Sequence, residues 1–269
     1  MANAEDKRKS VLITGCSPGG IGNALAREFH RQGLRVFATA RDAKTIEDLA
    51  SVGIETLSLV VDDKENYTVP AMEVDLAEAR ATFETNFISV ISMCQTFLPL
   101  LIKAKGTIVQ IGSVAGVIPY VFGSVYNASK AALHSFSETL RVELAPFGVN
   151  VTTVVTGGVQ SRIARTQRSL LPNSIYAPIE DEYHRRVTHS QDGAMPNTAY
   201  AKSVVAQVLY GSAPWRWFWP WAQGRKNWIW EGNKSWVVWL VAGGWGWTGL
   251  FQRIMARMFK LYRLKGARK

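Results

Sequence analysis

The 269-residue sequence predicts an α/β fold built on a doubly wound parallel sheet, on the basis of three observations. Short apolar, β-branched runs alternate with amphipathic helical stretches along residues 1–213, as expected for strands joined by crossover helices. A glycine-rich turn follows the first of these runs, an arrangement that holds a phosphate at a helix N-terminus. A serine, a tyrosine and a lysine lie farther along, at a spacing that suits acid–base chemistry.

Composition divides the chain into two parts. Hydrophobic residues make up 47% and charged residues 19%, as in globular proteins. Two cysteines and four scattered histidines give neither a disulfide framework nor metal-ligand spacing. The polar amino terminus lacks a secretory pattern, so we expect a reducing compartment.

Residues 1–200 carry 19 Lys and Arg against 20 Asp and Glu, residues 201–269 carry 12 against one, and all ten tryptophans lie from Trp215 to Trp247. We therefore expect a domain of residues 1–213 and an attachment tail of residues 214–269.

The first strands and the turn between them predict a dinucleotide site. Residues 10–14 (SVLIT) read as a buried strand, followed by TGCSPGGIG and a helix that ends at Gly33. The residue after the second strand, residues 34–40, reaches the adenosine ribose in such folds. Here it is Arg41, which favours NADP(H) over NAD(H), although Asp42 is adjacent. A third strand, residues 55–61, ends at Asp62 and Asp63.

The connection after the third strand is too short to contain a crossover helix and a fourth strand. A crossover helix and a fourth strand need a dozen or more residues for the connection alone. KENYTVPAM is all that separates Asp63 from Glu73, where a long amphipathic helix begins. That helix should run to about Lys103, with an interruption near Pro99. The sequence therefore predicts a sheet that lacks its fourth strand.

The chemistry is concentrated in residues 112–130. A strand over residues 107–111 leads to Ser113, and a helix over residues 124–147 carries Tyr126 and Lys130 one turn apart. A phenol ordinarily loses its proton near pH ~10, so it acts at neutral pH when a neighbouring cation stabilises the phenolate. Lys130 at i+4 can be that cation; the alternative is an ordinary exposed pair. Asn86 is polar in an apolar neighbourhood, and helix capping or packing is its alternative role.

Together these motifs, in this order, resemble those of the short-chain dehydrogenase/reductase family over roughly residues 9–165. The resemblance rests on TGCSPGGIG, Asn86, Ser113, YNASK and the turn after the strand of residues 149–155. It implies a Rossmann sheet and NADPH-dependent reduction of a ketone to a secondary alcohol. Within the family, TGGV in place of PGxV, the ELAPFGV helix exit and the Trp-rich basic tail are similar to fungal 1-acyldihydroxyacetone-phosphate reductases.

The resemblance also implies roles for individual residues. Tyr126 is the proton donor, Lys130 lowers its pKa and holds the nicotinamide ribose, Ser113 binds the substrate oxygen and Asn86 holds a relay water. The implied cofactor contacts are Gly15, Ser17, Gly20, Ile21, Gly22, Arg41, Asp62, Asn86, Tyr126, Lys130, Val159 and Ser161. Val60 stands where relatives have an adenine-contacting Asp, so Asp62 or Asp63 is expected to substitute.

Two departures from the family bear on function. The glycine turn is one residue longer than TGxxxGxG. The Asn-Asn-Ala-Gly motif and its strand are absent, so we hypothesise a shortened form of an otherwise intact reductase. The open alternatives are a reductase of a polyketide, sterol or other hydrophobic ketone, and an inactive relative that only binds.

The polar stretch of residues 161–196, which the resemblance identifies with the substrate lid, and the tail both suggest partners. Arg162, Arg165 and Arg168 recur every three residues, so a helix would place them on one face, either for a substrate phosphate or as a solvated surface. The tail combines aromatics with an acid-free basic helix, which indicates binding to an anionic membrane surface. Its uncharged run, Trp236 to Phe251, is short for a bilayer span. A homodimer interface or pocket cover is the alternative, nucleic acid fits poorly, and we expect the cytoplasmic face of the endoplasmic reticulum or lipid droplet.

Overall fold

The computed structural model describes residues 6–61, 67–161, 169–211 and 227–241, together with residues 254, 257–260 and 263. Within these residues, six strands form two parallel three-stranded sheets, ordered β1-β2-β3 and β4-β5-β6. The strands are β1 Ser10–Ile13, β2 Arg35–Ala40, β3 Glu55–Ser58, β4 Thr107–Ser113, β5 Asn150–Thr156 and β6 Trp228–Glu231. The helices are α1 Ile21–Arg31, α2 Glu47–Ala50, α3 Leu76–Phe83, α4 Ser89–Ala104, α5 Ser124–Leu144, α6 Glu180–Thr188, α7 Asn197–Tyr210 and α8 Ser235–Leu240.

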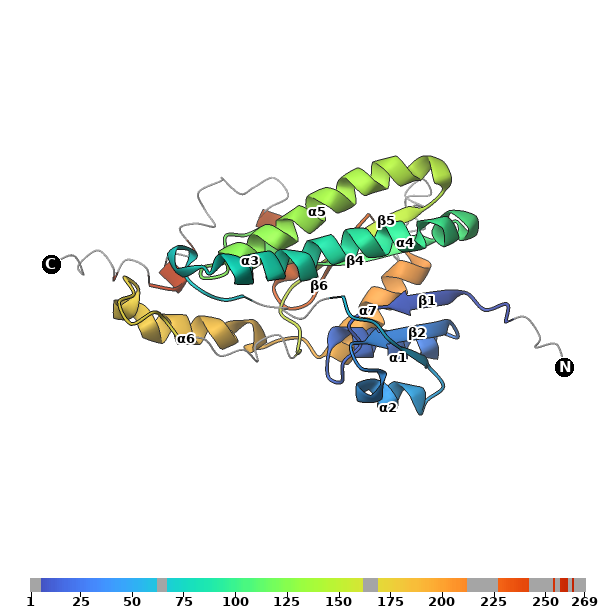
Figure 1. The fold of residues 1–269 in the computed structure, drawn as a ribbon, viewed down its shortest axis with the longest axis horizontal. Helices are drawn as coiled ribbons and strands as arrows, with labels where there is room; N and C mark the ends of the chain where they lie inside the picture. The colour runs from blue at the N-terminus through green and yellow to red at the C-terminus, as the bar shows by residue number, and fades with distance from the viewer. Residues whose placement is uncertain are drawn as a thin grey trace.

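One helix joins the two sheets. α7 packs against α1 beside the first sheet and against β6 in the second (Figure 1). Its buried residues Tyr200, Val204 and Val205 lie in one core cluster with Val36 of β2 and Val154 of β5. The Tyr200 hydroxyl is hydrogen-bonded to Thr156 Oγ1 at 2.7 Å, at the carboxyl end of β5. Apolar burial on both sides of α7 therefore keeps the two sheets in one domain.

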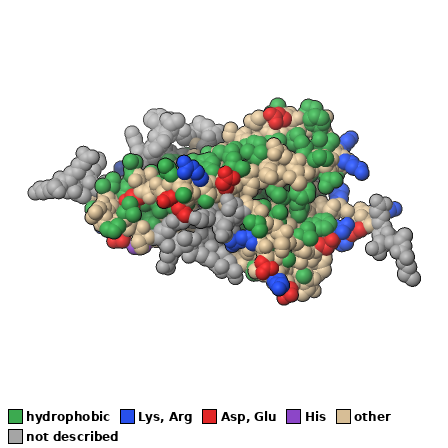
Figure 2. Space-filling model, in the orientation of Figure 1, with side chains coloured by type: hydrophobic (Ala, Val, Ile, Leu, Met, Phe, Trp, Pro, Cys, Tyr) green, Lys and Arg blue, Asp and Glu red, His purple; other side chains and the backbone are tan. Residues whose placement is uncertain are grey.

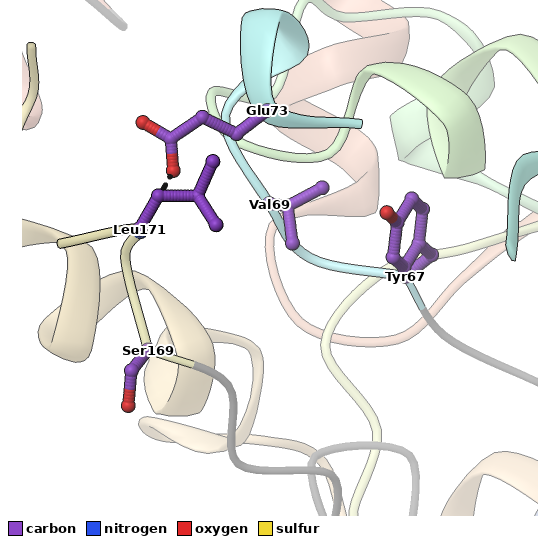
Figure 3. A pocket seen from close by; sticks show the side chains of 5 residues that line it. All are labelled: Tyr67, Val69, Glu73, Ser169 and Leu171. Carbon is purple, nitrogen blue, oxygen red and sulfur yellow. Dashed lines mark hydrogen bonds between the residues drawn. The ribbon is translucent and has the colours of Figure 1, made fainter. Parts of the chain in front are cut away.

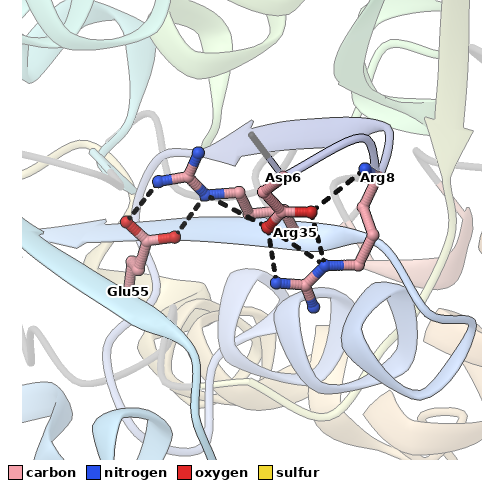
Figure 4. Close-up of polar contacts among 4 residues, drawn as sticks. All are labelled: Asp6, Arg8, Arg35 and Glu55. Carbon is pink, nitrogen blue, oxygen red and sulfur yellow. Dashed lines mark hydrogen bonds and ion pairs between the residues drawn. The ribbon is translucent and has the colours of Figure 1, made fainter. Parts of the chain in front are cut away.

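The amino ends of the first sheet carry a cluster of charges. Arg35 on β2 donates to Glu55 on β3 at 2.6 Å, and Arg8, just before β1, donates to Asp6 at 2.7 Å (Figure 4). These groups are largely exposed, so each pair contributes little to stability. The glycine turn lies beyond the opposite, carboxyl end of β1, which is where doubly wound sheets place their ligands.

The predicted gap in the sheet is present. β1 is hydrogen-bonded to β2 alone, and β4 to β5 alone, so each leaves one edge that no described strand covers. Asn150 N donates to Gly106 O. Because backbone groups alternate along a strand, the odd-numbered residues of β4, including Ile111 and Ser113, present their N–H and C=O groups to the uncovered edge. A strand between β1 and β4 would have paired with both edges.

A long helical stretch covers the second sheet. α3 and α4 are continuous through a π-helical turn, Glu84–Ile88, and lie beside α5 (Figure 1). The interruption expected near Pro99 is wrong, because Pro99 lies inside α4 and the irregular turn is at Asn86. By length and apolar composition, Leu76–Ala104 could cross a membrane, with a mean hydropathy of 1.6 and no buried residue in its most apolar window. Figure 2 shows hydrophobic side chains gathered over these helices on one face.

Part of the predicted tail is built into the α/β domain. Trp228–Glu231 forms β6, which pairs in parallel with β5, and Ile229 is 1% exposed. Asn233 N donates to Gly158 O in the loop that follows β5. Phe259 is fully buried and packs against Tyr120 at 5.9 Å between ring centroids. The boundary expected at residue 214 therefore does not separate these residues from the domain, and the part of the uncharged run beyond residue 241 lies outside the described residues.

Candidate active site

The glycine turn forms a close cradle between β1 and α1. Gly15 has a φ of +68°, a left-handed conformation that side chains disfavour. A Cβ on Gly22 would lie 2.5 Å from Gly15 O, and one on Gly20 would lie 3.0 Å from Ser17 O. No acidic side chain lies in the first turn of α1, and no side chain caps it. Its N–H groups, including that of Ile21, therefore remain oriented toward an anion, and the cradle fits a pyrophosphate.

The ribose position is set at the end of β2. Arg41 directly follows this strand and is exposed. The Asp42 carboxylate accepts from Lys44 N at 2.9 Å and so caps the short helix Ala43–Ile46. This contact commits Asp42 to a turn and leaves Arg41 as the residue that suits a 2′-phosphate. The predicted contact at Asp62 lies outside the described residues.

Ser113 ends β4 with its backbone and side chain both hydrogen-bonded. Its N–H donates to His134 Nε2 of α5 at 3.2 Å, and its Oγ accepts from Ala115 N at 3.1 Å. Burial, reinforced by the charge of Lys130, lowers the pKa of His134 to about 4, and Glu138 opposes the shift. The ring is therefore neutral at pH 7, and its Nε2 accepts.

Tyr126 and Lys130 lie one turn apart on α5, as predicted. The Lys130 ammonium is 5.8 Å from the centroid of the Tyr126 ring. Lys130 Nζ also donates to Ile111 O at 3.1 Å, a carbonyl on the uncovered edge of β4. His134, one turn further along α5, accepts from the same edge at Ser113. Two side chains of α5 thus satisfy backbone groups that an additional strand would otherwise have paired.

Asn86 lies in the π-helical turn and is linked to the tyrosine. Its Nδ2 donates to Ser129 Oγ at 3.2 Å, and Ser129 Oγ donates to Tyr126 O at 2.8 Å. π-helical turns of this kind occur frequently at functional sites. The structure therefore brings Asn86 against the helix that carries Tyr126 and Lys130.

The loop after β5 is fixed by a residue that the sequence did not single out. Val159 is buried, and its carbonyl accepts from Gln191 Nε2 at 3.3 Å. Gln191 Oε1 accepts from Ser161 N at 3.0 Å. Gln191 thus holds both predicted cofactor contacts of this loop. It lies thirty residues downstream in a polar stretch without periodicity, so no sequence pattern indicated it.

A cavity of about 270 Å³ lies near the amino end of α5. It is lined by Tyr67, Val69, Glu73, Ser169 and Leu171, from two segments on either side (Figure 3). Val69 forms a bridge with Gly123, the residue before α5. The cavity is therefore close to the proposed catalytic helix, although none of the predicted catalytic side chains lines it. Arg162, Arg165 and Arg168 lie outside the described residues.

Comparison with known proteins shows the relationship directly. Residues 65–171 match the family model for short chain dehydrogenase. The chain is 41% identical over 205 aligned positions to NADPH-dependent 1-acyldihydroxyacetone phosphate reductase of Schizosaccharomyces pombe, covering 64% of this chain and 69% of that protein. It is 34% identical to the short-chain dehydrogenase fogD of Aspergillus ruber, covering 96% of each. The crystal structure of a short-chain dehydrogenase from Streptomyces avermitilis matches the fold, with a TM-score of 0.71, 20% identity and coverage of 99% and 100%.

These alignments are longer than the part of this chain that they cover. The alignment with fogD has 287 positions but contains only 96% of the 269 residues of this chain. About 29 alignment positions are therefore occupied in fogD and empty in this chain. The same comparison for the Schizosaccharomyces pombe reductase gives about 33 alignment positions that are empty in this chain. About 30 residues match one crossover helix and one short strand. Within the aligned regions the relatives therefore have about 30 positions more than this chain, a total that equals the size of the segment that the gap between β1 and β4 requires. The glycine cradle, the Tyr126–Lys130 pair, the parallel sheets and the identity across the whole chain agree, and the protein belongs to the short-chain dehydrogenase/reductase family of oxidoreductases.

Proposed function

We propose that this protein is an NADPH-dependent reductase of a lipid-like ketone, with 1-acyldihydroxyacetone phosphate as substrate and 1-acylglycerol 3-phosphate as product. The observation that carries the proposal is the position of the Lys130 ammonium, 5.8 Å from the Tyr126 ring on a helix that Asn86 contacts through Ser129. The substrate class is supported by the name of the Schizosaccharomyces pombe relative. The cofactor is supported by that name and by Arg41 at the end of β2.

The chain's own residues divide the chemistry. The glycine cradle and Arg41 would hold NADPH, which would supply a hydride for the carbonyl carbon. Tyr126 gives its phenolic proton to the carbonyl oxygen, and Lys130 stabilises the phenolate that remains. Ser113 Oγ already accepts from Ala115 N, so its own O–H is placed to donate to the substrate oxygen as negative charge develops there. Asn86 holds the water that returns a proton to Tyr126.

A membrane surface is the proposed location of the reaction. Trp236, Trp239 and Leu240 on α8 are 66%, 54% and 51% exposed. Large aromatic side chains beside a basic segment favour the headgroup region of a bilayer. We place the protein at the cytoplasmic face of the endoplasmic reticulum or a lipid droplet, where an acylated ketone would partition.

An inactive relative whose role is to bind something other than the cofactor is the second candidate, and one observation favours it. Lys130 donates to the open edge of β4 at Ile111, so one of its three N–H groups is held by the backbone. A ribose hydroxyl would compete with that contact. In this case the protein binds NADPH weakly or not at all.

Titration of the purified protein with NADPH and NADH, followed by nicotinamide fluorescence, separates the two candidates. The reductase requires saturable binding that is tighter for NADPH, and the absence of such binding contradicts it. Tyr126→Phe should then abolish reduction of 1-acyldihydroxyacetone phosphate while NADPH still binds. The matched control is Tyr210→Phe, which removes an exposed hydroxyl on α7 that donates to Gln32. Turnover that persists in Tyr126→Phe excludes the proposed proton donor.

A further inference from the structure

A buried arginine on α6 lies beside the amino end of the helix that carries Tyr126. Arg186 is 5% exposed, and α6 turns it inward together with Tyr183 and Val187. Its Nε donates to Val121 O at 2.8 Å, and its guanidinium lies 3.5 Å from the centroid of the Tyr120 ring. A buried charge is costly to keep unless something compensates it.

No carboxylate of the described residues forms an ion pair with Arg186. Glu182, one turn earlier on the same helix, is paired with Arg185 and with Lys260 at 2.5 Å each. The group that packs against the guanidinium is instead the Tyr120 ring, and burial raises the pKa of the Tyr120 hydroxyl above its ordinary value, so this neighbour carries no negative charge at pH 7. Burial lowers the pKa of Arg186, yet a guanidinium stays protonated at neutral pH. The side chain therefore carries a positive charge that the described protein groups do not neutralise.

The free end of this guanidinium is directed at the start of α5. Arg186 Nη2 is 3.1 Å from the position that a Cβ on Gly123 would occupy, so glycine there leaves room beside it. Gly123 precedes α5, whose first turn has no acidic residue and no side-chain cap. Nε is the atom of Arg186 that is bonded within the described residues, which leaves the Nη1 and Nη2 hydrogens to a ligand. A guanidinium and a helix N-terminus thus converge three residues from Tyr126.

A second polar atom at this position also lacks a partner. Asn127 Oδ1 is buried and accepts no hydrogen bond among the described residues. It lies 3.1 Å from the same Cβ position on Gly123, the same distance as Arg186 Nη2. A ligand with an anionic oxygen for Arg186 and a hydroxyl or bound water for Asn127 would satisfy both groups.

We propose that Arg186 binds the phosphate group of the ketone substrate, and that it selects phosphorylated ketones over neutral ones. The proposal rests on the reductase function proposed above and assigns the headgroup subsite within it. Only a phosphate held at the amino end of α5 interacts favourably with both the positive charge of Arg186 and the helix dipole. The acyl chain is then free to extend away from Tyr126.

Steady-state kinetics on the phosphorylated and the dephosphorylated ketone measure the selectivity that we propose for Arg186. Arg186→Gln should raise KM for 1-acyldihydroxyacetone phosphate by about 10- to 100-fold, the range expected for one lost charged hydrogen bond or two. Its kinetics on the dephosphorylated ketone should change by less than about threefold. Arg185→Gln is the matched control, because it removes the same charge from the same helix at an exposed position. An equal loss on both ketones assigns Arg186 a structural role and overturns the proposal.

Binding without turnover separates this proposal from the reductase function. The probe is glycerol 3-phosphate, followed by tryptophan fluorescence, with glycerol as the neutral comparison. The wild-type chain and Arg185→Gln should bind it saturably, and Arg186→Gln should not, even if no ketone is reduced. If wild type shows no difference between the two probes, the subsite does not exist. Should Arg186→Gln fail to fold, Arg186→Lys decides: weaker but saturable binding supports the proposal, and unchanged binding contradicts a forked contact.

Discussion

His134 makes the end of β4 sensitive to acid. Its ring is 7% exposed, packs edge-on against Trp228 at 5.5 Å, and accepts the N–H of Ser113. Protonation of Nε2 would replace that acceptor with a second donor and would bring a charge close to Lys130. The neutral ring is thus the form that the folded protein stabilises, which is why its pKa falls from 6.5 to about 4.

The sign and size of the effect follow from that shift. As pH falls below 6.5, the unfolded chain takes up the proton first, so the free energy of unfolding decreases until about pH 4, where the folded ring is also protonated. An interval of about 2.5 pKa units corresponds to about 3 kcal/mol of lost stability. The contribution is present above pH 6.5 and is lost between pH 6.5 and 4.

Urea unfolding at a series of pH values, followed by tryptophan fluorescence, measures this loss. His134→Gln is the control, because an amide oxygen can accept from Ser113 N and does not titrate. Carboxylates with a lowered pKa, such as Asp6 and Glu28, contribute equally to both proteins and cancel in the comparison. If wild type and His134→Gln lose the same free energy between pH 6.5 and 4, His134 is not the group responsible.

Three further predictions concern the cradle, the tail and the gap. Gly22→Ala should weaken NADPH binding by about tenfold or more in fluorescence titration, because its Cβ would lie 2.5 Å from the backbone of the turn; unchanged affinity would place the pyrophosphate elsewhere. Trp236→Gln with Trp239→Gln should reduce co-sedimentation with anionic lipid vesicles, whereas Val142→Gln on α5 should not; equal binding by both removes the membrane role of α8. Inserting the corresponding segment of fogD, about 30 residues, between residues 61 and 67 should raise the melting temperature and strengthen NADPH binding, and a glycine-serine segment of equal length should do neither.

The sequence predicted the strands of the fold well because their periodicity is local. Residues 10–14, 34–40 and 107–111 proved to contain β1, β2 and most of β4, and the short connection after Asp63 agrees with the edges of β1 and β4 that no described strand covers. The third strand is shorter than expected and ends at Ser58. β6 was missed because its partner, β5, lies more than seventy residues away and its tryptophans were attributed to the tail. Strand pairing over that distance depends on tertiary contacts, which local composition does not encode.

The site was predictable where a motif fixes spacing along one element. Tyr126 and Lys130 share one helix, so their distance follows from helical geometry. His134 continues the same spacing at i+4 from Lys130, a signal that was present in the sequence and was not used. Arg186 and Gln191 carried no such signal, because each reaches the site from α6 or the turn after it across a long loop. Contacts made by chain packing alone require the structure.

The gap in the sheet connects the fold directly to the chemistry. In a complete parallel sheet, the backbone groups of Ile111 and Ser113 on this edge would be paired by a neighbouring strand. Here Lys130 and His134 satisfy them from α5, and one of these is the residue proposed to hold the ribose and stabilise the Tyr126 phenolate. The uncovered edge of β4 thus places the side chain that we propose to be catalytic in a structural contact, because a buried carbonyl without a partner is costly. The inserted segment should accordingly complete the sheet and raise the activity together, and either change without the other would show that Lys130 is not the link between them.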